Sequence, residues 1–271
     1  MSSAIRLVST DFDGTLFAEF ENPPVPLDLE IQIERLQALG VSWVINTGRD
    51  MSSLMEALGR ARLRVHPNFL VLVEREIYQR EGTRFVALEE WNHRCHDEHE
   101  AIFSRVRPDL DSLILWIEQN FDATLYDDPF SPLCLIARTN EDAEKIVAHL
   151  EAYAKSIPML TVVRNDVYAR FSHKAFNKGT ALAHITKRLG LTAKSVFAAG
   201  DHLNDLPMLR RQYAHFLAAP ANAIEVVKTV VSAQQGYVSH QPCGKGVARA
   251  LEFFLEVKGA KLPPAPCPPT P

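Results

Sequence analysis

The stretch VSTDFDGTLF, residues 8–17, places Asp11 and Asp13 directly after an apolar run that is typical of a buried strand. Carboxylates near a hydrophobic core cost free energy unless a cation or hydrogen-bond donors compensate them. A calcium loop is excluded, because the sixth and twelfth positions counted from Asp11 are Leu16 and Asn22 rather than glycine and glutamate. Gly14 allows the sharp turn that ends a parallel strand, where α/β sheets form ligand sites. On these residues alone, a solvated strand end remains the alternative.

The composition indicates a globular protein with one large domain or two unequal ones, since the chain has 271 residues of which 46% are hydrophobic. No segment approaches the roughly 18 apolar residues of a membrane span, so we expect a soluble protein that is neither secreted nor bound to a membrane. The four cysteines have no C-x-x-C spacing, and reduced thiols in the cytoplasm fit best. A net charge of −4 with scattered Lys and Arg argues against nucleic acid as a partner but leaves room for a small anion. The oligomeric state is unknown from the sequence.

Strand-like and helix-like segments alternate at both ends of the chain, which is typical of a parallel sheet with crossover helices. Residues 68–88 differ, since they read as extended segments with a turn at Glu81-Gly82. The expected strands are 5–11, 41–46, 195–201 and 213–218, and the expected helices are 29–36, 50–61, 178–190, 203–209 and 246–257.

The order of elements changes from about Trp91, where two helices, a strand, a third helix and two strands around an Asn-Asp turn are expected. We interpret residues 91–170 as an inserted second domain, because a unit of about 80 residues is a common domain size. Residues 1–90 and 171–258 then form the core domain. The proline-rich segment 259–271 is predicted to be a flexible tail.

Two further fragments could bind an anion. Thr47 and Gly48 follow the second predicted strand, where a hydroxyl and a free glycine amide can hold phosphate oxygens. A helix N-cap explains Thr47 almost as well. Lys178 opens the helix that follows the insertion, and its ammonium is either an ordinary surface charge or a phosphate clamp.

A fourth fragment, Gly-Asp-His-Leu-Asn-Asp at 200–205, follows the small-residue strand VFAAG. Asp201 and Asp205 could merely stabilise a helix N-terminus. If the strand ends meet, however, Asp11, Asp13 and Asp201 come together, and such a group of carboxylates suits a hard cation such as Mg²⁺.

Taken in order, D-x-D-G-T-L, T-G-R, N-K-G and G-D-x-x-N-D resemble the motif set of the haloacid dehalogenase superfamily of phosphohydrolases. The insertion between the second and third motifs resembles the Cof-like branch, which has a large α/β cap. Asn222-Ala223 and Gly246-Val247-Ala248 match further positions of that branch. The resemblance covers residues from Arg6 to about Val257. It implies an α/β fold with a Rossmann-like, doubly wound parallel sheet core and an inserted mixed α/β cap domain.

The resemblance also implies roles for the two opening carboxylates. Asp11 is expected to attack phosphorus and form an aspartyl-phosphate. Asp13 is expected to protonate the leaving oxygen and then to activate the water that hydrolyses the intermediate. Asp11, Asp201 and the main-chain carbonyl of Asp13 are the expected Mg²⁺ ligands.

By the same resemblance, the phosphoryl oxygens are expected to lie among Thr47, the amide of Gly48, Lys178 and Asn204. Asp205 is expected to orient its neighbours without contacting the substrate.

The function implied is Mg²⁺-dependent hydrolysis of a small phosphorylated metabolite, a phosphomonoester, with a sugar phosphate favoured. Two alternatives remain at this point. A phosphosugar mutase of the same superfamily would move the phosphoryl group between sugar positions, and a sensor built on the fold would bind a phosphometabolite without catalysis. The sensor is disfavoured because Asp11 and Asp13 are both present. A haloalkanoate dehalogenase is disfavoured because that chemistry needs neither Asp13 nor Mg²⁺.

The segment 91–100 contains His93, His96 and His99 among acidic residues. A transition-metal site is conceivable, but a solvated helix face is the favoured interpretation, because no further strand-borne ligands follow.

Overall fold

A computed structural model describes residues 4–257, and the chain divides into two compact units. The first unit consists of the residues up to Leu88 and those from Lys178 onward, and the second unit is Glu89–Asn177. The expected tail, 259–271, lies outside the described residues. Within residues 4–257, no helix combines the length and the apolarity needed to cross a bilayer.

The first unit is built on an eight-stranded sheet in which six strands are parallel and the last two pair antiparallel. Burial along the whole length, as expected for strands covered on both faces, is found for β1 (Leu7–Thr10), β3 (Phe69–Leu72), β10 (Val196–Ala199) and β11 (Phe216–Ala219). The spatial order of the strands is β12 (Tyr237–Val238), β11 (Phe216–Ala219), β10 (Val196–Ala199), β1 (Leu7–Thr10), β2 (Ser42–Asn46), β3 (Phe69–Leu72), β4 (Glu76–Glu81) and β5 (Arg84–Ala87).

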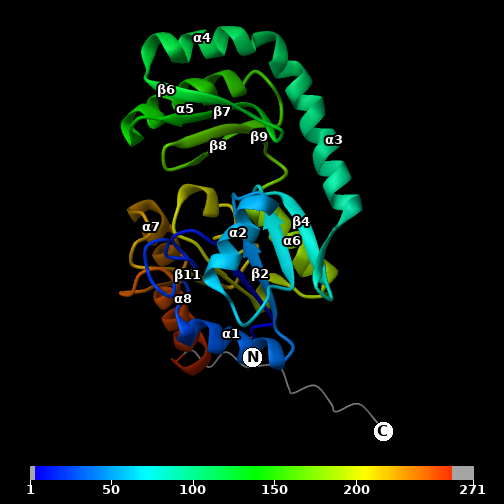
Figure 1. Cartoon of the computed structure of the whole chain (residues 1–271), viewed down its shortest axis with the longest axis vertical. Coiled ribbons are helices and arrows are strands. Elements are labelled where there is room, and N and C mark those ends of the chain that lie inside the picture. Colours follow the sequence, from blue (N-terminus) through cyan, green and yellow to red (C-terminus); the bar gives the residue numbers. More distant parts are fainter. Residues whose placement is uncertain (1–3, 258–271) are drawn as a thin grey trace. The chain divides into compact units, whose positions relative to one another are not determined.

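Amphipathic helices surround this sheet (Figure 1). The helices are α1 (Leu27–Ala38), α2 (Met51–Ala61), α6 (Lys178–Arg188), α7 (Glu225–Ala233) and α8 (Cys243–Glu252), the last continuing into a π-helical turn, η4 (Phe253–Val257). Helix α1 buries the expected stripe of Leu29, Ile33 and Leu36 and contacts α8. Helix α8 contacts β11, and α6 contacts β3. The unit is the Rossmann-like, doubly wound α/β core that the sequence predicts.

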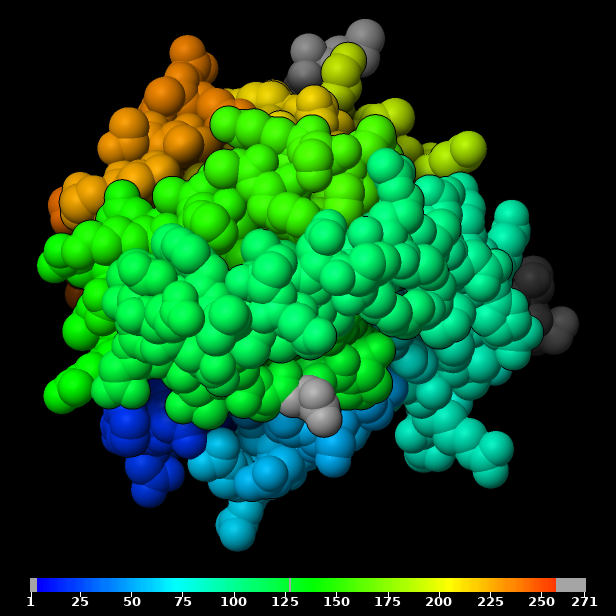
Figure 2. All heavy atoms as spheres, turned by 90° about the horizontal axis from the view of Figure 1, so that it is seen from above, coloured from blue at the N-terminus to red at the C-terminus, as the bar shows by residue number. Residues whose placement is uncertain are grey.

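The second unit is an antiparallel sheet packed against helices. The sheet order is β6 (Ala123–Asp128), β7 (Ser131–Ala137), β9 (Tyr168–His173) and β8 (Leu160–Asn165), and the helices are α3 (Glu89–Val106), α4 (Leu110–Asn120) and α5 (Asn140–Ala154), with a 3₁₀ turn, η1 (Arg107–Asp109), between α3 and α4. Alternate residues of β7, Leu133, Leu135 and Ala137, enter one apolar core with residues from all three helices. The outer side chains of α3 and α4 form a continuous face of this unit (Figure 2). It is the mixed α/β insertion that the sequence predicts.

The structure divides the chain at Leu88/Glu89 and Asn177/Lys178, whereas the sequence analysis placed the divisions after residues 90 and 170. The second difference has a clear cause. Strand β9 pairs with β7 and β8, so the residues that follow Arg170 remain part of the inserted sheet.

Some local predictions were wrong. The helix expected at 203–209 is only a 3₁₀ turn, η3 (Leu203–Asp205), because Pro207 has no amide hydrogen to continue the hydrogen-bond ladder. Two strands, β6 and β12, and one α-helix, α7, were not predicted. The Glu81-Gly82 turn was placed correctly, and Gly82 takes the left-handed conformation with φ of 60°.

Candidate active site

Predicted polar residues of the first unit directly follow its parallel strands and lie at one edge of the sheet. Asp11 follows β1, and its amide donates to the carbonyl of Ala199, the last residue of β10 (2.9 Å). Thr47 follows β2, and its amide donates to the carbonyl of Val71 in β3 (2.9 Å). Because β10, β1, β2 and β3 are neighbours in register, the residues directly after them lie side by side.

Lys178 lies at the centre of this edge and is fully buried. Its ammonium donates to Asp11 Oδ1 and to Asp205 Oδ1, each at 2.6 Å. Asp205 is also fully buried, and its Oδ2 accepts from the amides of Asp201 (2.8 Å) and His202 (3.0 Å). Both oxygens of Asp205 are therefore occupied in holding Lys178 and the 201–205 loop. Lys178 is thus a buried ion-paired cation rather than an ordinary surface charge.

Asp201 completes this group from the end of β10. The hydroxyl of Thr15 donates to Asp201 Oδ1 at 2.6 Å. Gly14, with φ of 72°, passes so close that an added Cβ would lie 2.5 Å from Asp201 Oδ2. Only glycine fits at this turn, both for its backbone conformation and for the space beside the carboxylate.

The carboxylates outnumber the cations in this group. Burial, followed by the charge of Asp205, raises the pKa of Asp11 well above its ordinary value despite the opposing effect of Lys178. Burial and Asp205 also raise the pKa of Asp201 to about 7. Burial disfavours the charge of Lys178, but the neighbouring Asp11 and Asp205 outweigh it and raise the pKa of the ammonium. Three carboxylates facing one ammonium form a site that attracts a cation or a proton.

A divalent metal ion fits these residues. One carboxylate oxygen each from Asp11, Asp201 and Asp205 lies within 4.8 Å of the others, and all are hard oxygen donors of the kind that Mg²⁺ prefers. The excess negative charge of the group is also what a dication would balance.

Asp13 is not one of the three carboxylates of this group and forms a bidentate pair with Arg49. Arg49 Nε donates to Asp13 Oδ2 at 2.8 Å, and Nη2 donates to Oδ1 at 2.6 Å. The hydrogen bond to Asp13 is the main cause of a raised pKa of Arg49. The guanidinium also lies over the ring of Phe12, 5.4 Å from its centroid. The Asp13 side chain remains 45% exposed, so it is accessible to a substrate.

Thr47, Gly48 and Asn204 lie together beside a residue that the sequence analysis did not single out, Glu74. Asn204 Nδ2 donates to Glu74 Oε1 at 2.9 Å, and an added Cβ on Gly48 would lie 3.4 Å from the same oxygen and 3.9 Å from Asn204 Nδ2. Thr47 is not the N-cap of α2, the alternative raised from the sequence. That cap is Asp50, whose side chain accepts from the amide of Ser53.

The sequence analysis missed three contributors to the site. Arg49 was quoted within the T-G-R motif without a role, and Thr15 within D-G-T-L. Glu74 follows the buried strand β3, so the reasoning that singled out Asp11 after β1 could have found it. The bidentate geometry of Arg49 and the contact between Thr15 and Asp201 had no signal in the sequence.

The histidines of α3 do not gather into a metal site. His93 and His96 are exposed, as expected for a solvated helix face, whereas His99 is buried, so the prediction was wrong for that residue. His99 Nδ1 contacts the carbonyl of Cys95 at 2.6 Å, and its Nε2 accepts from the amide of His173 at 3.2 Å. Since both ring nitrogens bond to backbone groups, His99 is a neutral structural residue.

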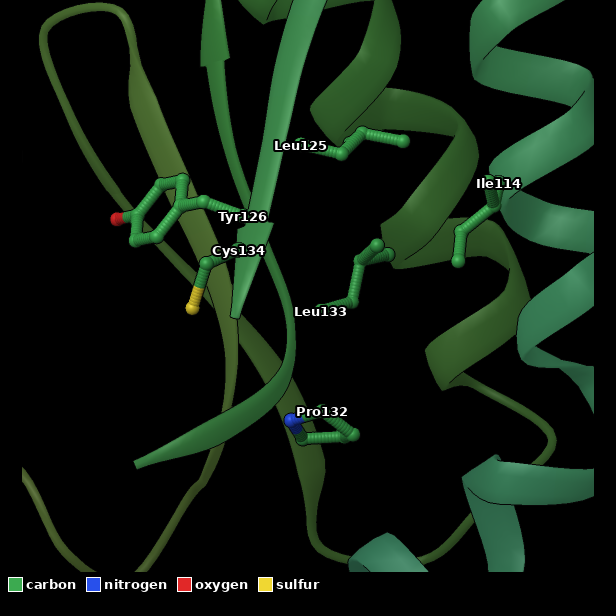
Figure 3. A pocket seen from close by; sticks show the side chains of 6 residues that line it. All are labelled: Ile114, Leu125, Tyr126, Pro132, Leu133 and Cys134. Carbon is green, nitrogen blue, oxygen red and sulfur yellow. The ribbon is translucent and has the colours of Figure 1, made fainter. Parts of the chain in front are cut away.

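The second unit also contains a hollow of about 250 Å³ beside the β6–β7 hairpin (Figure 3). Six residues line it, and two of them, Tyr126 and Cys134, carry ionisable groups. Burial raises the pKa of Tyr126 to about 12 and that of Cys134 to about 11, so both stay protonated near neutral pH. This hollow therefore offers no activated nucleophile.

The family is shown by comparison with known proteins. The model of the haloacid dehalogenase-like hydrolases matches residues 99–251, more than half of the chain. The chain belongs to this family, and the resemblance inferred from its motifs, including the Cof-like branch, is confirmed. It is a phosphatase, that is, a phosphoric monoester hydrolase.

Full-length relatives agree with this assignment. The 5-amino-6-(5-phospho-D-ribitylamino)uracil phosphatase of Bacillus subtilis is 24% identical over 93% of this chain and 96% of its own length. A phosphoglycolate phosphatase of Methanococcoides burtonii is 22% identical over 93% of this chain and 97% of its own. Among solved structures, the sucrose-phosphatase of Synechocystis has a TM-score of 0.66 and 18% identity, covering 94% of this chain and 98% of that one. This last likeness shows a shared fold.

Proposed function

We propose that this phosphatase hydrolyses a small phosphomonoester, with a sugar or polyol phosphate favoured, through an aspartyl-phosphate on Asp11 and with Mg²⁺ as cofactor. The observation that carries the proposal is the buried group in which Lys178 joins Asp11 and Asp205 beside Asp201. Such a concentration of unbalanced carboxylates is costly in a merely structural role. The leaving group is favoured by likeness, since one relative is named for a phosphoribityl compound and the sucrose-phosphatase structure holds sucrose and phosphate.

Asp11 is suited to be the nucleophile. It directly follows β1, and Lys178 holds one of its oxygens, Oδ1, at 2.6 Å. In the first half-reaction an oxygen of Asp11 forms a bond to phosphorus, the bond from phosphorus to the leaving oxygen breaks, and the leaving oxygen takes a proton from Asp13. In the second, water attacks the same phosphorus, Asp13 takes a proton from that water, and the carboxylate of Asp11 is regenerated with release of phosphate.

The pair between Asp13 and Arg49 has to open during this cycle. Both oxygens of Asp13 accept from the guanidinium, so at least one bond must be released before Asp13 can exchange a proton with the substrate. The pair is partly exposed, and breaking such a pair costs about 1 kcal/mol or less. Arg49 thus holds Asp13 at the site without fixing it permanently.

Mg²⁺ would be held by Asp11, Asp201 and the main-chain carbonyl of Asp13, since Asp205 is already occupied by Lys178 and two backbone amides. A bound dication would offset the repulsion between the anionic nucleophile and the anionic phosphoryl group. The hydroxyl of Thr15 orients Asp201 for this role. Thr47, the amide of Gly48, Lys178 and Asn204 would bind the phosphoryl oxygens.

The division of labour between the two carboxylates is tested with Asp13→Asn and p-nitrophenyl phosphate, whose leaving group departs without a proton. Attack by Asp11 should proceed, but hydrolysis of the intermediate loses its base. We expect a stoichiometric burst of nitrophenolate and a mass increase of roughly 80 Da on the peptide containing Asp11 after acid quench. The double variant Asp11→Asn/Asp13→Asn is the matched control and should form no adduct. If Asp13→Asn shows neither burst nor adduct, Asp13 does not serve as the base.

Metal and substrate are tested together by measuring phosphate release from a panel of sugar phosphates, polyol phosphates, nucleotides and phosphoglycolate, with Mg²⁺ or with chelator. Activity should require Mg²⁺ and should be highest for the polyhydroxylated substrates. Full activity in chelator would contradict the metal assignment, and a requirement for an activating sugar bisphosphate would indicate a mutase instead.

A further inference from the structure

The turn after β3 adopts a backbone conformation that its residues disfavour. Val73 and Glu74 both have positive φ, 50° and 67°, and the amide of Arg75 closes the turn by donating to the carbonyl of Leu72 at 2.9 Å. Turns with two such residues usually contain Asn and Gly, and a β-branched residue in this region is a marked exception. The left-handed conformation is unfavourable for a residue with a side chain, and such strain persists where the surroundings enforce it.

The surroundings of this turn are the loop that follows β2. The amide of Val73 donates to the carbonyl of Arg49 at 3.0 Å, and the amide of Glu74 donates to the carbonyl of Thr47 at 2.9 Å. Val73 and Glu74 are 2% and 6% exposed, so the strained turn is packed against the loop that carries Thr47 and Gly48. Strain and burial therefore coincide at the proposed phosphate-binding loop.

The side chain of Glu74 meets that loop and Asn204 at the same point. Its Oε1 accepts from Asn204 Nδ2 at 2.9 Å and lies 3.4 Å from the position where a side chain on Gly48 would begin. An asparagine amide nitrogen carries two hydrogens. Within residues 4–257, the second hydrogen of Asn204 Nδ2 has no acceptor in the protein, so it is available to a substrate oxygen.

We propose that Glu74 is a positioning residue of the phosphatase site, which holds the side-chain amide of Asn204 beside Gly48 so that its second Nδ2 hydrogen points to a phosphoryl oxygen. The proposal rests on the proposed phosphate-binding role of Asn204. Glycine at position 74 would relieve the backbone strain but would leave Asn204 free to rotate. The conformation of the turn would favour glycine at position 74. The glutamate is therefore explained by the hydrogen bond that its carboxylate accepts from Asn204.

The test compares Glu74→Gly, Glu74→Gln and Asn204→Ala with the control Gln235→Gly. Gln235 is exposed and also has positive φ, 58°, so this control relieves similar strain far from Asn204 in sequence and without changing the site. Both glycine variants should keep or raise the melting temperature, because glycine adopts this conformation without penalty. Of the two glycine variants, only Glu74→Gly should lose kcat/KM for p-nitrophenyl phosphate, by about 10- to 100-fold, and weaken binding of inorganic phosphate in the presence of Mg²⁺ by about tenfold.

Two readouts separate positioning from a general structural effect. Glu74→Gln retains an acceptor oxygen, so it should recover most of the phosphate affinity that Glu74→Gly loses. In an Asn204→Ala background, Glu74→Gly should cause no further loss, because the two residues act through one contact. Unchanged phosphate affinity in Glu74→Gly, no recovery in Glu74→Gln, or additive losses in the double variant would each overturn the proposal.

The affinity for inorganic phosphate is measured by calorimetry and does not require hydrolysis. The role of Glu74 can therefore be tested separately from the proposed function. If the unaltered protein bound phosphate but hydrolysed no phosphomonoester, the proposed reaction would fail. The effect of Glu74→Gly on phosphate affinity would still decide the role of Glu74.

Discussion

The acidic site of the core and the histidine cluster of the inserted unit, formed by His99 and His173, both contain buried ionisable side chains. The two regions differ in whether partners within the protein satisfy these side chains. At the site, the ammonium of Lys178 pairs with two carboxylates, Asp11 and Asp205, while a third, Asp201, lies beside them. In the cluster, the ring nitrogens of His99 and His173 each meet a partner. Those of His99 meet the carbonyl of Cys95 and the amide of His173, and those of His173 meet the amide of Ala175 and the carboxylate of Glu98.

This difference in partners distinguishes a candidate ligand-binding site from a group of buried residues that supports the fold. A group whose hydrogen bonds close on the protein itself contributes to stability and needs no ligand. A group with excess like charge is destabilised until a cation or a substrate balances it. Burial alone would have marked both regions as candidate sites, and only the count of charges and partners distinguishes them. The following predictions test this distinction.

The largest effect is expected for Asp11→Asn. The amide cannot attack phosphorus, so turnover of every phosphomonoester should fall by roughly a thousandfold or more. The variant removes one of three mutually repelling carboxylates, so thermal unfolding should shift little or to higher temperature. Steady-state kinetics and differential scanning calorimetry measure the two effects. Substantial residual turnover, with contaminating phosphatase excluded by a matched purification, would contradict the proposed role of Asp11 as the nucleophile.

The reverse pattern is expected for His99→Ala. The amide of His173 would lose its acceptor and the packing against Phe103 and Phe176 would be lost, so the free energy of unfolding should fall by about 2–4 kcal/mol. The kcat of the folded enzyme should change less than about threefold, because both ring nitrogens of His99 bond to backbone groups of the inserted unit itself. His96→Ala, on the exposed face of the same helix, is the control and should alter neither quantity. Loss of kcat without loss of stability would place His99 in the reaction.

A smaller effect is expected on the pH dependence of the free energy of unfolding, and it arises from the titration of Asp201. Its pKa is about 7 in the folded protein and lies near 3.8 in the unfolded chain, so between these values the folded state binds more protons. The stabilisation is complete below the unfolded value and is lost as pH rises through 7. In chelator, the free energy of unfolding should fall by about 1–2 kcal/mol between pH 6 and pH 8.

Two comparisons isolate this pH effect. Asp201→Asn should reduce the decrease, since the amide does not titrate, and what remains would come from the neighbouring Asp11, whose pKa is also raised. Mg²⁺ should remove the decrease, because the metal binds the ionised carboxylate and stabilises the folded state at high pH. Denaturant titrations at both pH values measure the difference, and an identical pH dependence in the Asn variant would show that Asp201 is not its source.

The sequence alone was sufficient for the core elements that carry strong periodic patterns. The apolar runs before Asp11 and Asp201 predicted β1 and β10, and the stripe of Leu29, Ile33 and Leu36 predicted α1. The ordered motifs indicated the family and all eight candidate site residues, which the structure places in the first unit. These predictions depend on local properties, namely side-chain alternation, strand-end chemistry and the spacing of motifs.

Other features depended on contacts between residues distant in sequence. Strand β6 has a weak pattern of its own and is defined by pairing with β7, and the return to the core comes after β9 because β9 pairs with β7 and β8. Whether each histidine of α3 is buried or exposed likewise depends on the residues that it contacts. His96 and His99 are three residues apart on one helix, yet only His99 meets the backbone of β9.

The sequence by itself therefore determined the class of fold, the family and the chemical types of the site residues, because these follow from local patterns and from the order of motifs. Only the tertiary structure decided that Lys178 is buried between two carboxylates, that Arg49 holds both oxygens of Asp13, and that Glu74 lies against Asn204. The two residues of each of these pairs lie 27 or more positions apart in the chain. Their hydrogen bonds form only when parallel strands bring distant loops to one edge of the sheet, and no local pattern encodes that geometry.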